Sequence, residues 1–364
     1  MVLYWYIFGI VALLSLQSSV FQRRSLTSIG NFTFNGICIF LFIVLGFRYR
    51  VGGDWNTYQE YNADHLGLPF NSVYSPGNDP GYNFFNWLGA NFLGGVILPN
   101  LVMAAIFIFG VHRFCLTLPR PFLGLLVSLP FLVWVVGAGY TRQAAALGLF
   151  LVALCYVRSG NVFGYLTFAG LSILFHKTAV GLLPFGLFLV PRLFSVRALS
   201  VALLFITVTG LLFYGFISAN IHMLIKYLEH EYTSHGTTPR MVIIGLCALI
   251  FISFNSRFNI YLTEKRFWSV FSSAGLFIIL ISLSSISSTP FDRILLYWLP
   301  LKMYLLAHLP SAFSQDVGNS RGLIIISIIL FAASMQFVWF SYSPNAYAWS
   351  PYLFFPWEIV WGDA

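Results

Sequence analysis

The sequence predicts an all-α protein, a polytopic transmembrane helical bundle of about twelve spans, and three observations support this fold class. Hydrophobic residues make up 59% of the 364-residue chain and charged residues only 8%, which is more apolar surface than a soluble core can bury. Apolar runs recur along the whole length and leave no room for a soluble domain of ordinary size. The charges between these runs are shared unequally between the two sides of the membrane. We therefore expect a single integral membrane domain over residues 1–364.

Twelve apolar runs bounded by polar clusters form the predicted spans. They are Leu3–Val20, Phe32–Phe47, Val96–Leu116, Phe122–Gly137, Thr141–Val157, Val162–Phe175, Thr178–Val190, Ala198–Ile217, Val242–Phe254, Phe267–Ile286, Ile294–Leu309 and Gly322–Phe340. The first lacks the basic region and cleavage site of a secretory signal, so we expect it to be retained. The sixth and seventh are shorter than the roughly 20 residues that a bilayer requires, so the turn between them should lie recessed below the outer surface.

The connections between the spans alternate between two faces, and basic residues favour one face. Eleven Lys and Arg residues against two acids lie on that face, whereas seven against nine lie on the other, and Lys302 lies inside the eleventh span. Because cytoplasmic loops carry the excess of basic residues, this count places both termini outside the cytoplasm. The basic residues are scattered singly, so the formal charge of +8 does not indicate nucleic-acid binding.

Three larger pieces lie on the outer face, namely residues 48–95, residues 218–240 and the tail 341–364. In the first, one helical stripe is apolar and carries Tyr82, Phe85, Leu88 and Phe92. Asn83 and Asn86 lie off this stripe, a pattern that predicts an interfacial helix. The alternative is a transmembrane hairpin through residues 82–116. It would reverse the membrane orientation of every earlier segment and remove the charge asymmetry between the two faces.

The most informative motif is FRYRVGGDWNTYQEY, residues 47–61, at the outer end of the second span. Arg48 and Arg50 supply planar donors suited to phosphate oxygens, while Gly52 and Gly53 permit a bend that returns Asp54 towards them. Aromatic side chains that could stack on sugar rings follow at Trp55, Tyr58 and Tyr61. The alternative is interfacial anchoring, because aromatic and arginine residues commonly flank membrane spans.

Two further motifs carry polar residues at the outer ends of spans. Arg142 opens the fifth span, where the helix dipole is unfavourable, so it requires a carboxylate or a bound anion as partner unless it snorkels to the interface. His176 and Lys177 occupy the recessed turn, where His176 is either a catalytic group or simply a hydrogen-bonded side chain. Both motifs therefore predict functional groups on the outer face.

Two other polar clusters allow a bland interpretation. Asp292 and Arg293 open the eleventh span beside Tyr297, and the acid could simply neutralise the arginine. The outer loop EHEYTSH could bind a divalent metal, although a solvated loop is the more natural interpretation. The four cysteines lie in apolar runs without metal-ligand spacing and are interpreted as packing residues.

The candidate residues all fall on the outer face, although their chemistry played no part in the topology. A cluster of cations and candidate bases there suits a large anionic substrate presented from the outer leaflet. Nucleotide sugars are scarce outside the cytoplasm. We therefore expect a lipid-linked donor that carries its own phosphate or pyrophosphate leaving group.

Five motifs between residues 47 and 300 support a family resemblance through their order and spacing. They are FRYRVGGDWNTYQEY, DPGYNFFNWL, YTRQAAALGLFL, FHKTAVGLLP and DRILLYWLP. The chain thereby resembles the Wzy-type O-antigen and exopolysaccharide polymerases of lipopolysaccharide and related glycan synthesis, especially the EpsG-like branch. The resemblance implies a GT-C-like glycosyltransferase in the bacterial inner membrane whose site faces the periplasm. It also implies that a growing glycan is transferred from undecaprenyl pyrophosphate onto a new lipid-linked repeat unit.

Residue roles follow as hypotheses from that mechanism, which requires neither a metal nor a cofactor. Arginines can stabilise the leaving pyrophosphate without a metal, and we assign this group to Arg142 and Arg293, with Arg48, Arg50 and Lys177 as further pyrophosphate ligands. The candidate bases are His176, Asp54 and Asp292. We favour His176 because a recessed imidazole titrates near working pH. The expected sugar contacts are Trp55, Tyr58, Tyr61 and Tyr297, and the tail aromatics Tyr347, Trp349, Tyr352 and Trp357 could roof the site.

Three alternatives remain open at this point. An O-antigen ligase or another outward-facing transferase that uses lipid-linked sugars would share most of these features. A lipid-linked oligosaccharide flippase or transporter would place its polar groups near the midplane, and an O-acyltransferase would draw its donor from the cytoplasm. Expected partners are the lipid-linked donor and acceptor and membrane lipid, with a chain-length regulator and a flippase as further candidates.

Overall fold

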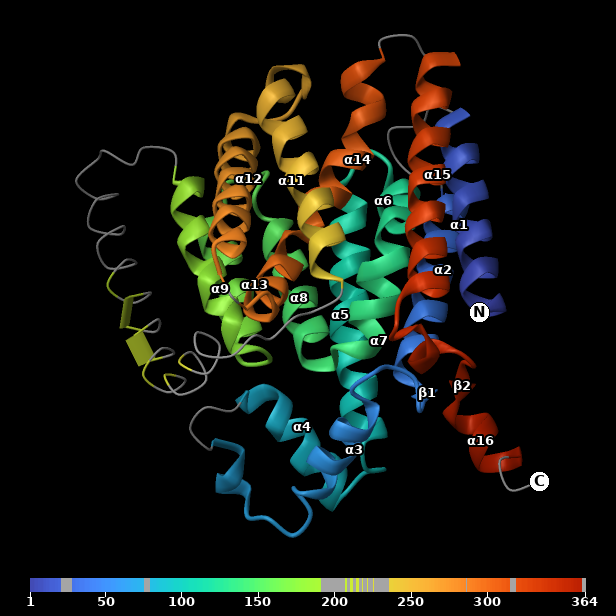
Figure 1. Ribbon diagram of the computed structural model, residues 1–364, viewed down its shortest axis with the longest axis vertical. Helices are drawn as coiled ribbons and strands as arrows, with labels where there is room; N and C mark the ends of the chain where they lie inside the picture. Colours follow the sequence, from blue (N-terminus) through green and yellow to red (C-terminus); the bar gives the residue numbers. More distant parts are fainter. Residues whose placement is uncertain are drawn as a thin grey trace. The chain divides into compact units, whose positions relative to one another are not determined.

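The computed structural model describes residues 1–20, 28–74, 79–190, 236–285, 287–314 and 319–361, with isolated positions between 207 and 225 (Figure 1). Two predicted features lie essentially outside these residues, namely the eighth span, Ala198–Ile217, and the EHEYTSH loop, residues 229–235. Several charges behind the predicted orientation also lie outside them, including Arg23, Arg24, Arg192 and Arg197.

The described chain is almost entirely helical, which confirms the predicted fold class. The apolar helices begin with α1 (Val2–Val20), α2 (Ser28–Gly46), α5 (Ile97–Thr117), α6 (Pro121–Ser128), η2 (Leu129–Val136), α7 (Gly137–Gly139), α8 (Thr141–Leu154), α9 (Val162–Ile173) and η3 (Lys177–Leu189). They continue with α11 (Thr237–Phe254), α12 (Leu262–Leu283), α13 (Thr289–Leu295), η5 (Leu296–Trp298), α14 (Leu299–Phe313) and α15 (Asn319–Tyr342). Hydrocarbon offers no partner for backbone groups, so continuous helices are the expected form of these runs.

Smaller elements connect these helices. They are β1 (Arg48–Tyr49), α3 (Trp55–Ala63), η1 (Phe70–Tyr74), α4 (Pro80–Asn91), η4 (Asn255–Arg257), η6 (Ala346–Trp349), β2 (Leu353–Phe354) and α16 (Phe355–Trp361). Within the described residues, six helical stretches are long and apolar enough to cross a membrane by length and composition. They are Ser28–Gly46, Ile97–Thr117, Pro121–Gly139, Thr237–Arg257, Leu262–Leu283 and Ser320–Tyr342. The chain is thus a membrane protein.

The chain divides into two compact units. Unit 1 comprises residues 1–148, 174–176 and 306–364, and unit 2 comprises residues 149–173 and 177–305. Unit 1 therefore combines both ends of the sequence, whereas unit 2 is inserted between them. Within unit 1, α3, α4 and the β1–β2 pair lie at the same end of the unit, beside the first turns of α5 (Figure 1).

The two short predicted spans differ in helix type. The sixth is α9, with 12 residues, and the seventh is η3, a 13-residue 3₁₀ helix. Because a 3₁₀ helix rises about 2.0 Å per residue, η3 extends about 26 Å. An α-helix of the same length would extend only about 20 Å. The stretched helix therefore reduces the shortfall that the residue count predicts for the seventh span.

The C-terminal tail packs against the chain that follows the C-terminal end of α2. Strands β1 and β2 are antiparallel, with Arg48 opposite Phe354, and Gly52 N–H donates to the Ala348 carbonyl over 2.8 Å. Gly52 has a φ of +106°, and a Cβ there would lie 2.5 Å from the carbonyl oxygen of Ala138. The predicted bend thus rests on Gly52, since Gly53 has open space around it.

The tail aromatics divide into buried and exposed residues. Trp349 is buried, its Nε1 donates to the Trp134 carbonyl over 2.7 Å, and its ring leaves no space for a Cβ at Gly139. The Tyr352 hydroxyl donates to the Val44 carbonyl over 2.7 Å. Tyr347 and Trp357 are exposed. Trp349 and Tyr352 therefore fasten the tail to the rest of unit 1.

Helix α4 occurs where the interfacial helix was predicted, but its buried face is not the apolar stripe. Tyr82, Asn83, Asn86 and Gly89 are buried, whereas Phe92 is 65% exposed. The asparagines pack on α3, where Asn62 Nδ2 donates to the Asn86 carbonyl over 3.0 Å. The prediction assumed that the buried face would be apolar. Asparagines can be buried instead, because their side-chain amides hydrogen-bond to one another and to the backbone. With 12 residues, α4 rises about 18 Å, too short for the alternative hairpin.

Candidate functional site

The central feature of unit 1 is an ion pair between Arg142 and Asp79. Arg142 is the second residue of α8, and Asp79 precedes the first turn of α4. Arg142 Nη1 lies 3.0 Å from Asp79 Oδ2, and the arginine side chain is 41% exposed while that of the aspartate is 4% exposed. The carboxylate partner that the helix start requires is therefore Asp79, a residue that the sequence analysis did not single out.

Two tyrosines border this ion pair. The Arg142 guanidinium carbon lies 6.0 Å from the ring centre of Tyr61 and 5.8 Å from that of Tyr82, within the range of cation–π attraction. The two rings stack with their centres 5.8 Å apart, and the Tyr61 hydroxyl donates to Asn83 Oδ1. Burial raises the pKa of Tyr61, so its phenol stays neutral. The Arg142 guanidinium is thus contacted by Asp79 and the two tyrosine rings, and part of it remains exposed.

Arg48 is fully enclosed rather than available to a ligand. Its side chain donates to the carbonyls of Val51 and Leu45 over 3.3 and 2.7 Å, and to Asn100 Oδ1 and Thr141 Oγ1 over 3.0 and 2.7 Å. The residue is 1% exposed, and burial lowers its pKa to about 10, so it stays charged at neutral pH. This geometry favours a bracing role for Arg48, because these bonds use most of its five N–H donors.

The other residues of the 47–61 motif differ in accessibility. Arg50 is exposed, has a φ of +53° and places its guanidinium carbon 5.2 Å from the ring centre of Tyr49. Asp54 is half-buried at the N-cap of α3. Trp55 and Tyr58, predicted as sugar contacts, are buried, so they favour packing roles. Arg50 is therefore the accessible cation of this motif.

The turn that carries His176 is fastened to the start of α4. Residues 174–176 belong to unit 1, and Gly81 N–H donates to the Leu174 carbonyl over 2.7 Å. A Cβ at Gly81 would lie 3.0 Å from that oxygen, so the close approach depends on glycine. Gly81 is two residues after Asp79. The half-buried His176 therefore belongs to the same region of unit 1 as the Arg142–Asp79 pair.

Unit 2 contains a second ion pair, which changes the expectation for Asp292. This carboxylate pairs with Arg240 of α11, and the two side chains are 4% and 7% exposed. The sequence suggested the adjacent Arg293 as the partner that Asp292 neutralises. The observed partner is Arg240, which comes from a distant part of the sequence. Arg293 itself is half-buried. Arg240 thus joins Asp79 as a residue whose importance was missed.

Tyr297, a predicted sugar contact of unit 2, takes part in a contact between η3 and η5. Thr178 Oγ1 donates to the hydroxyl of Tyr297 over 3.4 Å, and the Tyr297 ring packs 6.2 Å from that of Phe150. Tyr297 is 1% exposed, which favours packing over contact with a sugar. Lys177, directly before Thr178, is half-buried.

In the described part of the chain, no group of three or more His, Cys, Asp or Glu residues is arranged to bind a metal. The EHEYTSH loop, where a metal was considered, lies outside that part. The structure thus brings Arg142 and Tyr61 together with Asp79 and Tyr82 in unit 1. In unit 2 it pairs Asp292 with Arg240.

Comparison with known proteins gives one match. The model of the EpsG family matches residues 31–354, which is most of the chain. No curated protein and no solved structure matches the chain significantly. The matched region contains every candidate base, pyrophosphate ligand and sugar contact described above, whereas Trp357 of the tail lies beyond it.

Proposed function

The chain belongs to the EpsG family, a Wzy-like polymerase family, and from this premise we propose that it extends a polysaccharide on undecaprenyl pyrophosphate. At the coarse level it is a membrane-embedded polymerase of the glycosyltransferase type. The finer proposal names a lipid-linked donor, a lipid-linked acceptor and a GT-C-like site at the outer face of the inner membrane. One observation carries it, namely the half-exposed guanidinium of Arg142 braced by the buried carboxylate of Asp79.

The proposed reaction is a direct glycosyl transfer. A sugar hydroxyl of the new repeat unit attacks the anomeric carbon of the growing glycan, and the bond from that carbon to the pyrophosphate oxygen breaks. The hydroxyl proton passes to a base, and undecaprenyl pyrophosphate leaves with the bonding electrons. Because negative charge develops on the leaving oxygen, fixed cations placed beside it accelerate the step.

Arg142 is the proposed ligand of the donor pyrophosphate. A guanidinium presents five N–H donors in a planar fork, and Asp79 Oδ2 is the acceptor for Nη1 in this structure. The exposed part of the group can meet a second anion, while Asp79 fixes its orientation from the buried side. Tyr61 and Tyr82 restrict the guanidinium laterally, and the half-buried Tyr61 offers aromatic surface to a sugar, whereas Tyr82 is buried.

His176 is the proposed general base. It lies on the turn that the Gly81–Leu174 hydrogen bond fastens to α4, and it is half-buried. Asp292 is less suited because it is buried against Arg240, and the half-buried Asp54, at the N-cap position of α3, is the second candidate. A neutral imidazole can accept a proton near neutral pH, whereas an unperturbed carboxylate is a weaker base.

The remaining cations are proposed to serve the two lipid pyrophosphates. Arg50 is accessible in unit 1, and Arg293 and Lys177 are half-buried in unit 2. We assign the enclosed Arg48 to bracing the outer end of α2, where it contacts Thr141 directly before Arg142. The proposed reaction needs no metal, because arginines supply the charge that a cation would otherwise provide.

The decisive test supplies purified protein with synthetic lipid-linked repeat units and separates the products by length. The proposal expects a ladder of longer chains on undecaprenyl pyrophosphate, which persists in excess EDTA. A strict requirement for a divalent metal would overturn the metal-free reaction. A single added unit would indicate a ligase or a simple transferase instead, and transport without a new glycosidic bond would indicate a flippase.

The base assignment has its own test. His176→Gln is expected to lower the rate of chain extension strongly, because the amide cannot accept the hydroxyl proton. His65→Gln is the histidine control, since His65 follows α3 and its Nδ1 contacts the Tyr61 carbonyl. Near-full activity of His176→Gln would move the assignment to Asp54. Both variants should bind the lipid-linked donor as wild type does, since neither removes a proposed pyrophosphate ligand.

A further inference from the structure

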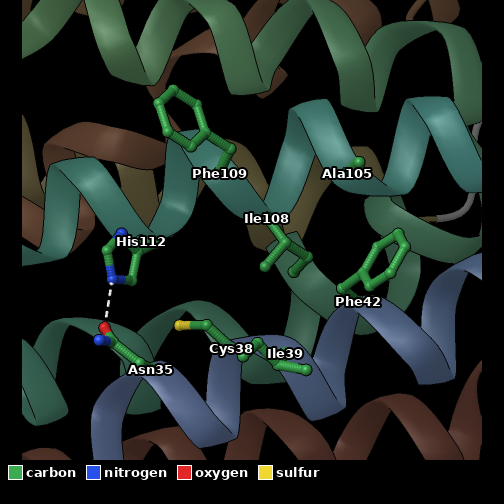
Figure 2. Close-up of a pocket in the computed structure, with 8 residues that line it drawn as sticks. All are labelled: Asn35, Cys38, Ile39, Phe42, Ala105, Ile108, Phe109 and His112. Atoms are coloured by element: carbon green, nitrogen blue, oxygen red, sulfur yellow. Dashed lines mark hydrogen bonds between the residues drawn. The ribbon is translucent and has the colours of Figure 1, made fainter. Parts of the chain in front are cut away.

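An apolar groove runs between α2 and α5 in unit 1, away from the residues of the proposed reaction. It has a volume of about 400 Å³. Its walls are two helical stripes, Asn35, Cys38, Ile39 and Phe42 on α2, and Ala105, Ile108, Phe109 and His112 on α5 (Figure 2). Each stripe covers seven residue steps, so the groove is about 10 Å long. Both helices are long and apolar enough to span a membrane.

The groove has a closed floor and open walls. Cys38 and Ile108 are each 4% exposed and form the floor, whereas Ile39 is 60% and Phe109 54% exposed. Ala105 is exposed as well, and its small side chain leaves room opposite Phe42. In a membrane, such an open apolar groove is filled by hydrocarbon. The lining therefore suits one lipid chain laid along the helices.

One end of the groove is polar. His112 Nε2 donates to Asn35 Oδ1 over 2.8 Å, and this hydrogen bond joins the two helices (Figure 2). The exposed Asn35 amide and the half-buried His112 imidazole are unfavourable against lipid tails, so this end fits a headgroup or ester region better than a hydrocarbon interior. The exposed Arg113 follows His112 directly and adds a permanent positive charge.

We infer that this groove binds an anionic phospholipid, with one acyl chain between α2 and α5 and the phosphate at the His112–Arg113 end. Charge complementarity with Arg113 selects the anionic headgroup, and the amide nitrogen of Asn35 can donate to an ester or phosphate oxygen. The charge count assigns this end to the cytoplasm, so the lipid belongs to the inner leaflet. The substrate pyrophosphates are proposed for the opposite face, which makes this a separate lipid site.

Native mass spectrometry of the protein from nanodiscs of equal phosphatidylglycerol and phosphatidylcholine tests the inference. Wild type should retain one phosphatidylglycerol several-fold more often than phosphatidylcholine. Arg113→Gln should abolish that preference, whereas Arg257→Gln, which removes an exposed arginine of unit 2, should preserve it. Ala105→Phe should displace the lipid by filling the groove, and Leu249→Phe on the exposed side of α11 serves as its control.

Several results would overturn the inference. Equal retention of the two lipids by wild type would mean that the groove takes any hydrocarbon chain. Unchanged retention in Ala105→Phe would place the lipid elsewhere, and Ile39→Trp repeats this test should the first variant misfold. Displacement of phosphatidylglycerol by undecaprenyl phosphate would make the groove a substrate site, and a disulfide-linked dimer of Ile39→Cys would make it a contact between copies. These measurements do not depend on polymerase activity, so their outcome tests the lipid site independently of the proposed reaction.

Discussion

The two units each contain an arginine–aspartate pair, but the two pairs differ in exposure. In unit 1 Asp79 is buried and Arg142 is 41% exposed, whereas in unit 2 both Asp292 and Arg240 are nearly inaccessible. A buried pair surrounded by protein fixes structure, because removal of either member leaves an uncompensated charge. In a pair whose arginine is partly exposed, the buried carboxylate orients the guanidinium and the exposed part can still contact an anion. The difference in exposure is the basis for proposing a binding role for Arg142 and a structural role for the Asp292–Arg240 pair.

The largest effect should come from breaking the closed pair. Asp292→Asn leaves Arg240 buried without its counter-charge, which we expect to lower the free energy of unfolding by about 3–5 kcal/mol. Thermal unfolding in detergent measures this loss. The double variant Arg240→Met/Asp292→Leu should recover much of it, since no charge remains buried. A double variant as unstable as the single one would contradict the clamp role.

Arg142→Ala should separate activity from stability. Loss of a donor to the leaving group typically costs about 10²–10³-fold in rate, and we expect chain extension to fall by that factor. The variant should lose less stability in thermal unfolding than Asp292→Asn, because removal of the 41% exposed Arg142 side chain opens the Asp79 carboxylate to water, whereas Arg240 stays enclosed. Arg142→Lys should recover only part of the rate, since a lysine lacks the planar fork. Normal chain lengths from Arg142→Ala would refute its role.

Asp79→Asn should have an intermediate effect on activity. The amide keeps the shape of the side chain but holds the guanidinium less firmly, so we expect a fall of about tenfold in rate, equivalent to about 1.4 kcal/mol. A positioning role predicts that kcat falls more than KM rises. Asp64→Asn, which changes an exposed acid at the end of α3, is the matched control. An equal loss in both variants would exclude a specific role for Asp79.

Tyr61→Phe should have the smallest effect. The ring stays beside Arg142, but the hydrogen bond to the buried Asn83 is lost, which we expect to reduce stability by about 1 kcal/mol. Chain extension should stay within about threefold of wild type. Tyr61→Ala, which also removes the ring, should reduce the rate further. Equal rates for the two variants would show that the ring does not contribute.

The sequence predicted the positions of the helices better than it predicted which side chains contact one another. The run Val96–Leu116 corresponds to α5 at Ile97–Thr117, because length and hydrophobicity are local properties. The Arg142–Asp79 contact joins residues 63 positions apart, and periodicity carries no information about such pairs. A sequence signal for Asp79 existed, since an acid directly before Pro80 and Gly81 marks a helix start, but it did not reveal the burial of the carboxylate.

The residues of the 47–61 motif show why composition misleads about roles. Arg48 and Arg50 are two positions apart and chemically identical, yet one is enclosed by four neutral acceptors and the other is exposed. A continued strand would place residues two positions apart on the same side, but β1 ends at Tyr49 and Arg50 has a positive φ, so the chain turns between the two arginines. Neither feature is visible in residue types alone.

The division of unit 1 between both ends of the sequence has a consequence for synthesis. Residues 149–305 leave the ribosome after α5 and before α15, and translation at about 5–20 residues per second delays the second part of unit 1 by roughly 8–30 s. During that interval Trp134 lacks both Gln336 and Trp349, its later hydrogen-bonding partners. A newly made chain therefore passes through a period in which its first helices are inserted but incompletely packed. Membrane proteases and chaperones can recognise it during this time.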